Sequence, residues 1–274
     1  MKKHLSTIIL ILVFLTGLSL LLYPSVSDYW NSFHQSRAIA TYAGEVAALD
    51  NDDYDQLWAS AQAYNQRLAE KEKPLIQSEE DLAEYETLLD IAGSGVMGYI
   101  EIPEIKVSLP IYHGVDEGVL QIAVGHIPGT SLPTGGKGTH SVLSGHRGLP
   151  SAKLFTNLDQ LREGDTFLLR VLDETLTYEV DQILIVEPHQ LEALAIDPGQ
   201  DYCTLVTCTP YGVNTHRLLV RGHRVENQAD AASIRVTADA MQIEPVIVAP
   251  VVAAPMLLFL MLWVLLRNPK KKKR

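Results

Sequence analysis

Apolar runs at both ends of the chain constrain its fold more than any other feature, because each is long enough to cross a membrane. The run from Leu5 to Tyr23 has 19 residues without a charge, and a helix of about 20 apolar residues spans the hydrocarbon core. The run from Pro245 to Leu266 has 22 residues and is followed by a basic tail. We therefore expect a transmembrane helix at each end of the 274-residue chain.

Each run has an alternative interpretation. A cleaved signal peptide also fits the first run, but no small-residue cleavage site follows Tyr23, which favours an uncleaved anchor. A buried core helix also fits the second run, which Pro250 and Pro255 interrupt. Its length and the basic residues after it favour a span, and spans tolerate proline better than soluble helices do.

Basic residues flank both runs and indicate how the chain is oriented. Lys2 and Lys3 precede the first run, whereas Arg267 and the cluster at 270–274 follow the second. Under the positive-inside rule both termini are cytoplasmic and the middle of the chain lies outside. The flanks hold eight of the 22 cationic residues, which leaves 14 cations against 33 acids and a net charge near −19 outside. Such a domain is unsuited to nucleic acid, whose phosphates require the opposite charge.

The segment between the first run and Gly95 has helical patterning. A helix is predicted across 39–71, with a break near 51–53, because apolar residues recur there every three or four positions. A second, short helix is predicted to start at a capping box formed by Ser78 and Asp81 and to stop at Gly93.

After Gly95 the pattern changes to short β-rich runs separated by glycine and proline. Strands are predicted within 97–105, 107–114, 138–146, 165–172, 175–187, 203–208 and 216–225, with helical pieces at 153–161 and 189–195. Runs at this spacing favour a closed or nearly closed β-barrel with helical connections.

The two cysteines of the chain, Cys203 and Cys208, are unsuited to a disulfide with each other. They are five residues apart in one predicted strand, and an odd separation sends the side chains to opposite faces. Cys203 is then expected to be a small buried hydrophobe. Cys208 lies where the strand ends, and no Cys or His at ligand spacing accompanies it, so we expect a nucleophile and neither a metal nor another cofactor.

A thiol nucleophile needs a base or a cation close by, because an isolated thiol is mostly protonated at neutral pH. His146 ends a predicted strand between glycines, where both a structural and a catalytic role are open. Arg217 has eight residues between it and Cys208, so the two lie at the same end if their strands form a hairpin. A guanidinium there would hold an oxyanion or a substrate carbonyl.

These residues resemble the sortase family. The pattern TLVTC with a downstream arginine and an upstream strand ending in histidine is similar to the motif of sortases, and GYIEIPEI resembles their opening strand. The longer strings GHIPGTSLPTGGKGTHSVLSGHRGLPSAKLF and TCTPYGVNTHRLLVRGHR resemble class C, the pilus-assembling branch. The resemblance covers about residues 95–225.

The resemblance implies a mostly β fold, an eight-stranded sortase barrel preceded by helices and flanked by two transmembrane helices. The expected divisions are an anchor at 1–24, a helical region at 25–94, the barrel at 95–226, a linker at 227–244, a span at 245–266 and a basic tail at 267–274.

The resemblance also implies a reaction, with Cys208 as nucleophile, His146 as general acid and base, and Arg217 as the stabiliser of the oxyanion. The thiolate would cleave the Thr-Gly bond of an LPxTG-like sorting signal to give a thioacyl enzyme. A lysine amine of a pilin subunit would then resolve it, at the plasma membrane of a Gram-positive bacterium. Expected partners are pilins or surface proteins with such signals.

Other functions stay open at this point. The same chemistry can anchor proteins to peptidoglycan precursors, and a non-catalytic membrane scaffold would make Cys208 incidental. A papain-like protease fits less well, because there the nucleophile precedes the histidine, whereas here His146 comes first.

One feature departs from class C. Many class C members carry an Asp-Pro-aromatic lid over the cysteine before the barrel, but this chain has AEKEKPLIQSEED there, and its only Asp-Pro pair is Asp197 and Pro198. Leu75 and Ile76 are the alternative candidates for a cover.

Overall fold

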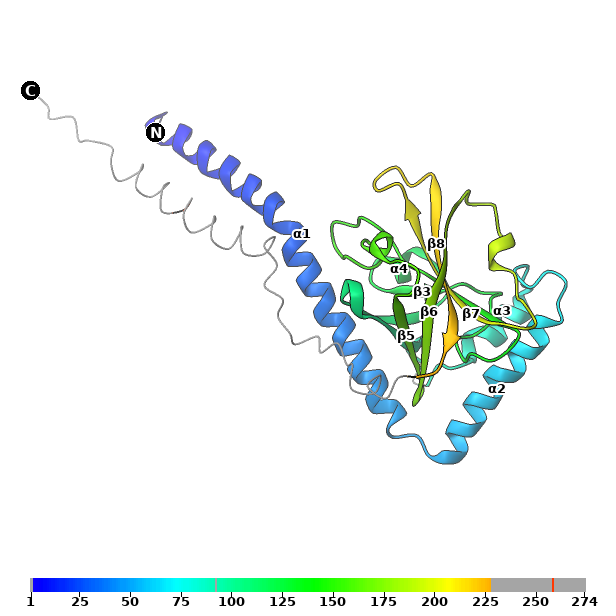
Figure 1. Cartoon of the computed structure of the whole chain (residues 1–274). Coiled ribbons are helices and arrows are strands. Elements are labelled where there is room, and N and C mark those ends of the chain that lie inside the picture. Colours follow the sequence, from blue (N-terminus) through cyan, green and yellow to red (C-terminus); the bar gives the residue numbers. More distant parts are fainter. Residues whose placement is uncertain (1, 92, 228–257, 259–274) are drawn as a thin grey trace, which may run out of the picture.

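The computed structural model describes residues 2–91, 93–227 and 258 (Figure 1). The predicted second span at 245–266 lies outside the described residues except for Leu258, and so do the basic tail and nearly all of the linker.

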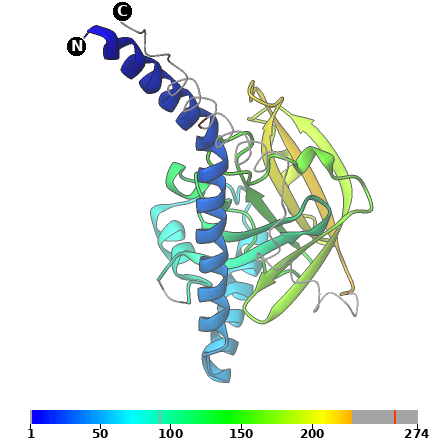
Figure 2. The same ribbon diagram turned by 90° about the vertical axis from the view of Figure 1, so that its left-hand side faces the viewer.

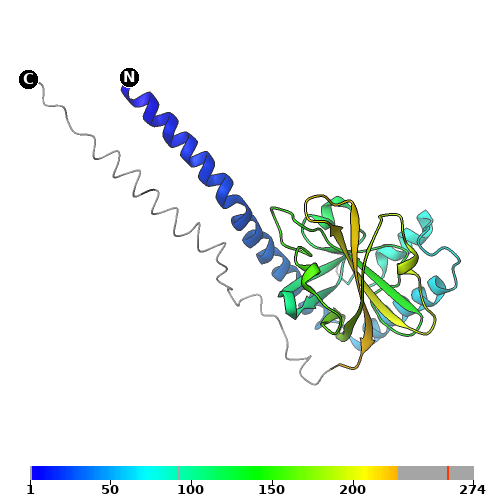
Figure 3. The ribbon, with the colours of Figure 1, turned by 45° about the horizontal axis from the view of Figure 1, so that its top comes forward.

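A single long helix, α1 (Lys2–Val46), begins the chain. It contains Pro24 and continues without a break, so the predicted boundary at residue 24 is not a boundary of secondary structure. Among the described residues, it is the one helix with the length and composition to cross a membrane. Its first half extends beyond the barrel, and its second half runs along the barrel's side (Figures 2 and 3).

Two shorter helices, α2 (Asn51–Ala69) and α3 (Glu79–Thr87), connect α1 to the barrel. The predicted break lies just before α2, where the side chain of Asp50 accepts a hydrogen bond from the backbone of Asp53. The capping box of Ser78 and Asp81 is confirmed at the start of α3. The prediction that this helix reaches Gly93 is wrong, because it ends at Thr87 and Leu89 adopts a left-handed φ of 60°.

Within the described residues, eight strands close a barrel in the order β1-β2-β3-β4-β7-β8-β6-β5. They are β1 (Val96–Ile102), β2 (Val107–His113), β3 (Val124–His126), β4 (Thr139–Ser144), β5 (Thr166–Val171), β6 (Glu174–Val186), β7 (Asp201–Thr209) and β8 (His216–Val225). The pairs β2–β3 and β4–β7 are parallel, and the other pairs are antiparallel. The eight-stranded barrel is confirmed.

The connections are less helical than the sequence pattern predicts. Of the predicted helices at 153–161 and 189–195, only single 3-10 turns form, η2 (Leu158–Gln160) and η3 (Glu192–Leu194). The other short elements are η1 (Pro103–Ile105) and α4 (Glu117–Leu120).

The main core fills the barrel and extends outward to α2 and α3 through Leu68 and Tyr85, which are 1% exposed. Helix α1 is fastened to the barrel by Tyr42, whose hydroxyl donates to the Met97 carbonyl at 3.0 Å and accepts from the Leu172 amide at 2.8 Å. Both hydrogen bonds are buried, so the helical segment and the barrel form one packed unit.

Candidate active site

The two thiols lie on opposite sides of strand β7. Cys203 is 0% exposed and belongs to the core inside the barrel, whereas Cys208 is half-buried near the end of the strand. Both cysteines are free. Burial raises the pKa of the Cys203 thiol well above its ordinary value. Of the two thiols, Cys208 is therefore the one suited to nucleophilic chemistry.

Cys208 continues a row of apolar residues on the outer face of the barrel. Val142 of β4, Val206 of β7 and Leu219 of β8 form a small buried cluster separate from the main core. We call these three residues the outer apolar strip. Because side chains alternate along a strand, Cys208 lies on the same face as Val206, two positions before it. Leu194, from the β6–β7 connection, packs against the strip.

Arg217 lies directly across the β7–β8 ladder from Cys208. The two residues are register partners in the antiparallel pair, and directly opposite residues have Cβ atoms about 4.5–5.5 Å apart on one face of the sheet. The Arg217 Nη1 atom donates to the backbone carbonyls of Asn214 at 3.2 Å and His216 at 3.1 Å. These bonds hold the half-buried guanidinium beside the β7–β8 turn.

His146 follows β4 on the other side of β7. The parallel ladder pairs Ser144 with Val206, and the Gly145 amide donates to the Val206 carbonyl at 3.0 Å. His146 comes two residues after Ser144, and Cys208 comes two residues after Val206. The parallel register therefore brings the half-buried His146 to the level of the thiol.

Two neighbours that the sequence did not single out hold this arrangement. The buried Thr207 hydroxyl donates to the Gly145 carbonyl at 2.8 Å, just before His146. Arg147 donates to the Thr209 hydroxyl at 3.3 Å and to the Asp159 carboxylate at 2.5 Å. A threonine at position 207 of TLVTCT indicated a side-chain hydrogen bond in the sequence. Its partner, the Gly145 carbonyl, becomes known only from the pairing of β4 with β7.

The remaining arginines of β8 have structural partners. Arg221 makes two hydrogen bonds to the Asp181 carboxylate, at 3.0 and 2.9 Å. Arg224 donates to the Thr175 carbonyl at 3.3 Å.

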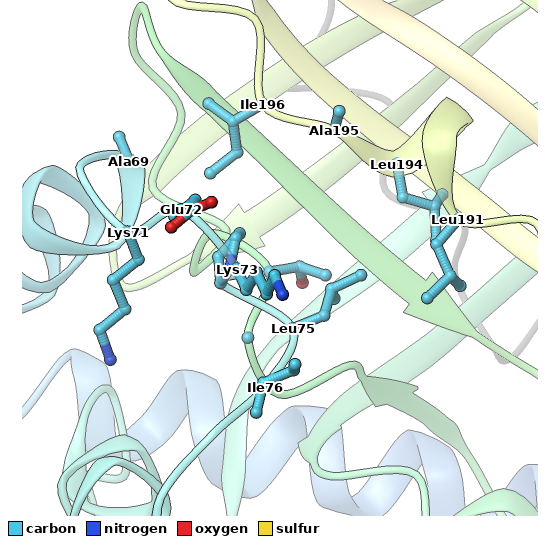
Figure 4. A pocket seen from close by; sticks show the side chains of 13 residues that line it. Ala69, Lys71, Glu72, Lys73, Leu75, Ile76, Leu191, Leu194, Ala195 and Ile196 are labelled. Carbon is cyan, nitrogen blue, oxygen red and sulfur yellow. The ribbon is translucent and has the colours of Figure 1, made fainter.

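A cavity of about 410 Å³ lies at the other end of the outer apolar strip (Figure 4). It separates Leu75 and Ile76 of the α2–α3 loop from Leu191 and Leu194 of the β6–β7 connection. Cys208, His146 and Arg217 are not among its lining residues. Leu75 and Ile76, the candidate cover, therefore lie near the end of the outer apolar strip that is far from Cys208. Their protection of the thiol stays a prediction.

Comparisons with known proteins identify the family of this chain. The family model described as Sortase domain matches residues 100–225. A solved structure of sortase C1 from Streptococcus agalactiae is 51% identical, with a TM-score of 0.69, and the match covers 70% of this chain and 100% of that one. The chain belongs to the sortase family. Sortases are cysteine transpeptidases, which confirms the predicted enzyme class.

Other solved sortases support the class C branch. Sortase C from Streptococcus pneumoniae, whose structure was described for its bearing on catalysis and pilin substrate specificity, is 43% identical. The match has a TM-score of 0.63 and covers 70% of this sortase and 98% of that chain. Sortase C-1 from Actinomyces oris is 48% identical, with a TM-score of 0.59, over 63% of this sortase and 99% of that chain.

Two curated relatives match over shorter stretches of the chain. Sortase A from Streptococcus agalactiae serotype III is 32% identical over 42% of this sortase and 47% of that protein. Sortase D from Bacillus subtilis is 30% identical over 47% of this sortase. The match spans 63% of the Bacillus protein, so about half to two thirds of each relative is covered.

Proposed function

We propose that this sortase cleaves an LPxTG-like sorting signal between Thr and Gly and joins the new carboxyl end to a lysine amine of a pilin subunit. The observation that carries the proposal is the direct pairing of Cys208 with Arg217, with His146 two residues past the end of the neighbouring strand β4, whose register with β7 places it at the same level. The class C relatives, one of them described for its pilin specificity, favour pilin as the substrate.

The chemistry divides among three side chains. The Cys208 thiolate attacks the Thr carbonyl carbon, and Arg217 stabilises the oxyanion that forms. The His146 imidazolium donates its proton to the departing Gly amine, which leaves a thioester on the sulfur. The lysine amine then attacks the thioester carbon and loses a proton to His146, and the thiolate leaves as the new amide forms.

The outer apolar strip forms an apolar base beside the thiol, and it is almost fully covered, with Val142 0%, Val206 7% and Leu219 4% exposed. It lies on the same face as Cys208, and the β6–β7 connection borders it. A sorting signal that uses this base for its apolar part would displace the β6–β7 connection, whose Leu194 packs on the strip.

We also propose the domain division and topology that the sequence predicts. The catalytic unit would be 95–226 and the preceding helical region 25–94, outside a Gram-positive plasma membrane with both termini inside. The apolar helix α1 supports membrane anchoring.

The test uses a soluble fragment that lacks both apolar runs, an LPxTG peptide and a lysine-containing pilin peptide. Mass spectrometry should detect a thioacyl adduct on Cys208 and then an isopeptide product. Cys208→Ala should abolish both, His146→Ala should lower turnover by at least 100-fold, and Arg217→Lys should stay poor because an ammonium lacks the planar fork.

Matched controls are Cys203→Ala inside the barrel, His223→Ala, whose register partner is Tyr202 near the other end of β7, and Arg162→Lys, and each should retain activity. Absence of any adduct on folded protein with several sorting sequences would falsify the proposal. Release of the peptide to water in preference to amines would indicate a protease. In a deletion strain, loss of wall-anchored monomers with intact pilus ladders would indicate peptidoglycan anchoring.

A further inference from the structure

Helix α1 determines which end of the barrel is nearest the membrane. Asp28 and Asn31 follow the predicted span within eight residues of Tyr23. The Asp28 carboxylate accepts from the Lys153 amide at 3.0 Å, and the Asn31 amide donates to the Ser151 carbonyl at 2.8 Å. Both partners lie in the loop that follows His146, so the membrane-side end of α1 is fastened at the site end of the barrel.

The other end of α1 is fastened at the opposite end of the barrel. Tyr42 bonds to Leu172, in the turn between β5 and β6. Strand β6 starts at this turn and ends at Val186, which pairs with Arg217. The 14 residues from Asp28 to Tyr42 span about 21 Å of helix. Helix α1 therefore runs from the site end, nearest the span, to the far end of the barrel (Figures 1 and 2).

Apolar side chains are exposed on both sides of α1 at this level. On the helix face away from the barrel, Tyr29 and Trp30 are 64% and 63% exposed. On the barrel, Tyr211 and Val213 in the β7–β8 loop are 61% and 64% exposed. Figure 2 shows this loop, the gold tip at the top of the barrel, at the level of the N-terminal half of α1.

The β7–β8 loop is held to the segment that fastens α1. The ring of Tyr211 packs so closely on Gly148 that an added Cβ would lie 2.9 Å from it. Gly148 has a φ of +75° and leads directly into the 151–153 loop, which is hydrogen-bonded to α1. The contact with Gly148 therefore fixes the position of Tyr211 relative to α1.

The positions of Tyr29 and Trp30 along the helix axis match the position of the lipid headgroup layer. Tyr29 and Trp30 lie about 9–10 Å beyond Tyr23 along the axis, and helical side chains point back toward the N-terminus. Their rings then reach a headgroup layer about 6 Å thick, where Tyr and Trp are enriched. Tyr29 and Trp30 lie on one side of α1 and the β7–β8 loop lies on the other. The helix therefore stands close to upright, because leaning would lift one of these two groups out of the headgroup layer.

The geometry points to a membrane contact: the cysteine-bearing end of the barrel faces the lipid bilayer, with Tyr29 and Trp30 on one side of α1 and Tyr211 and Val213 on the other in the headgroup layer. The occupant is lipid because Tyr29 and Trp30 follow the apolar run without a break in the helix. The inference rests on membrane insertion of α1 and not on the transpeptidase reaction.

The experiment uses the full chain in nanodiscs of phosphatidylcholine. A Cys208→Ala background carries an environment-sensitive dye at Val213→Cys or, as the matched control, at Asp173→Cys, which is exposed in the β5–β6 turn at the far end. Nitroxide lipids labelled at the headgroup should quench the dye at position 213 at least threefold more than the dye at 173. With Trp58 and Trp263 replaced by Phe, so that Trp30 is the remaining tryptophan of the sequence, its fluorescence should be quenched by the same lipids.

The remaining outcomes decide the inference. Equal quenching at both positions, or more at 173, overturns the orientation. Quenching at 213 that disappears at high salt overturns the apolar contact and indicates electrostatic attraction. Flotation of the reconstituted protein with lipid confirms insertion of α1 in each sample, and a failure of peptide ligation has no effect on these readings.

Discussion

A buried histidine makes the stability of this sortase depend on pH. His126, in β3, is 0% exposed, and its Nε2 atom lies 2.8 Å from the Ser131 carbonyl while its Nδ1 atom lies 3.0 Å from the Tyr85 hydroxyl. Because a carbonyl only accepts, Nε2 carries the proton, and the Tyr85 hydroxyl beside Nδ1 donates to the His126 backbone carbonyl at 3.0 Å. Burial lowers the pKa of His126 from 6.5 to about 4, so the folded protein holds this imidazole neutral.

The size of the effect follows from the two pKa values. The unfolded chain binds the proton near pH 6.5 and the folded one only near pH 4. Between these values the unfolded state binds more protons, so stability is lost as the pH falls from about 6.5 to about 4. At about 1.36 kcal/mol for each pKa unit, the loss from this residue is about 2.5 kcal/mol between about pH 7.5 and about pH 4.5.

The assay is urea unfolding of a soluble fragment at these two pH values, with His126→Asn for comparison. The parent should lose about 2.5 kcal/mol more than the variant on acidification, since the carboxylates titrate equally in both. His189→Gln, whose side chain is 77% exposed in the parent, should behave as the parent does. If His126→Asn and the parent lose stability equally, the histidine is not buried neutral and the argument is wrong.

The other perturbations concern close packing and the candidate cover. Tyr42→Phe leaves a buried amide and a buried carbonyl unpaired and should lower the free energy of unfolding by about 1–3 kcal/mol, whereas Tyr29→Phe at an exposed position should not change it. Gly125→Ala would put a Cβ 2.1 Å from the backbone of Gly114 and should cost more than about 2 kcal/mol in the same assay, against little change for Gly199→Ala. Serine at both apolar positions of the α2–α3 loop should speed alkylation of the site thiol if that loop protects it, and an unchanged rate removes the idea.

Much of the barrel was predictable because its strands alternate and are separated by glycine and proline. The opposite orientations of Cys203 and Cys208 followed from their odd separation alone. Strand β3 was missed, since it has three residues, all buried, and too few positions to show alternation. The helices predicted at 153–161 and 189–195 failed because tertiary contacts, such as Leu194 on the outer apolar strip, outweigh helix propensity in short connections.

Only part of the arrangement of the candidate site could be predicted from the sequence. The hairpin that pairs Cys208 with Arg217 is local, so sequence spacing indicated it. The position of His146 depends on a parallel pairing of β4 and β7, whose partners lie 62 residues apart, and no local pattern encodes that register. Without the resemblance, the strand-end position of His146 left a structural and a catalytic role equally open.

The buried thiol of Cys203 can report how often the barrel opens. It is sealed inside with no exposed surface, and it is one of only two thiols in the whole sequence. A thiol reagent applied to Cys208→Ala protein would therefore modify nothing until the strands separate. The rate of that single modification measures how often the cylinder opens, in native buffer and without any denaturant.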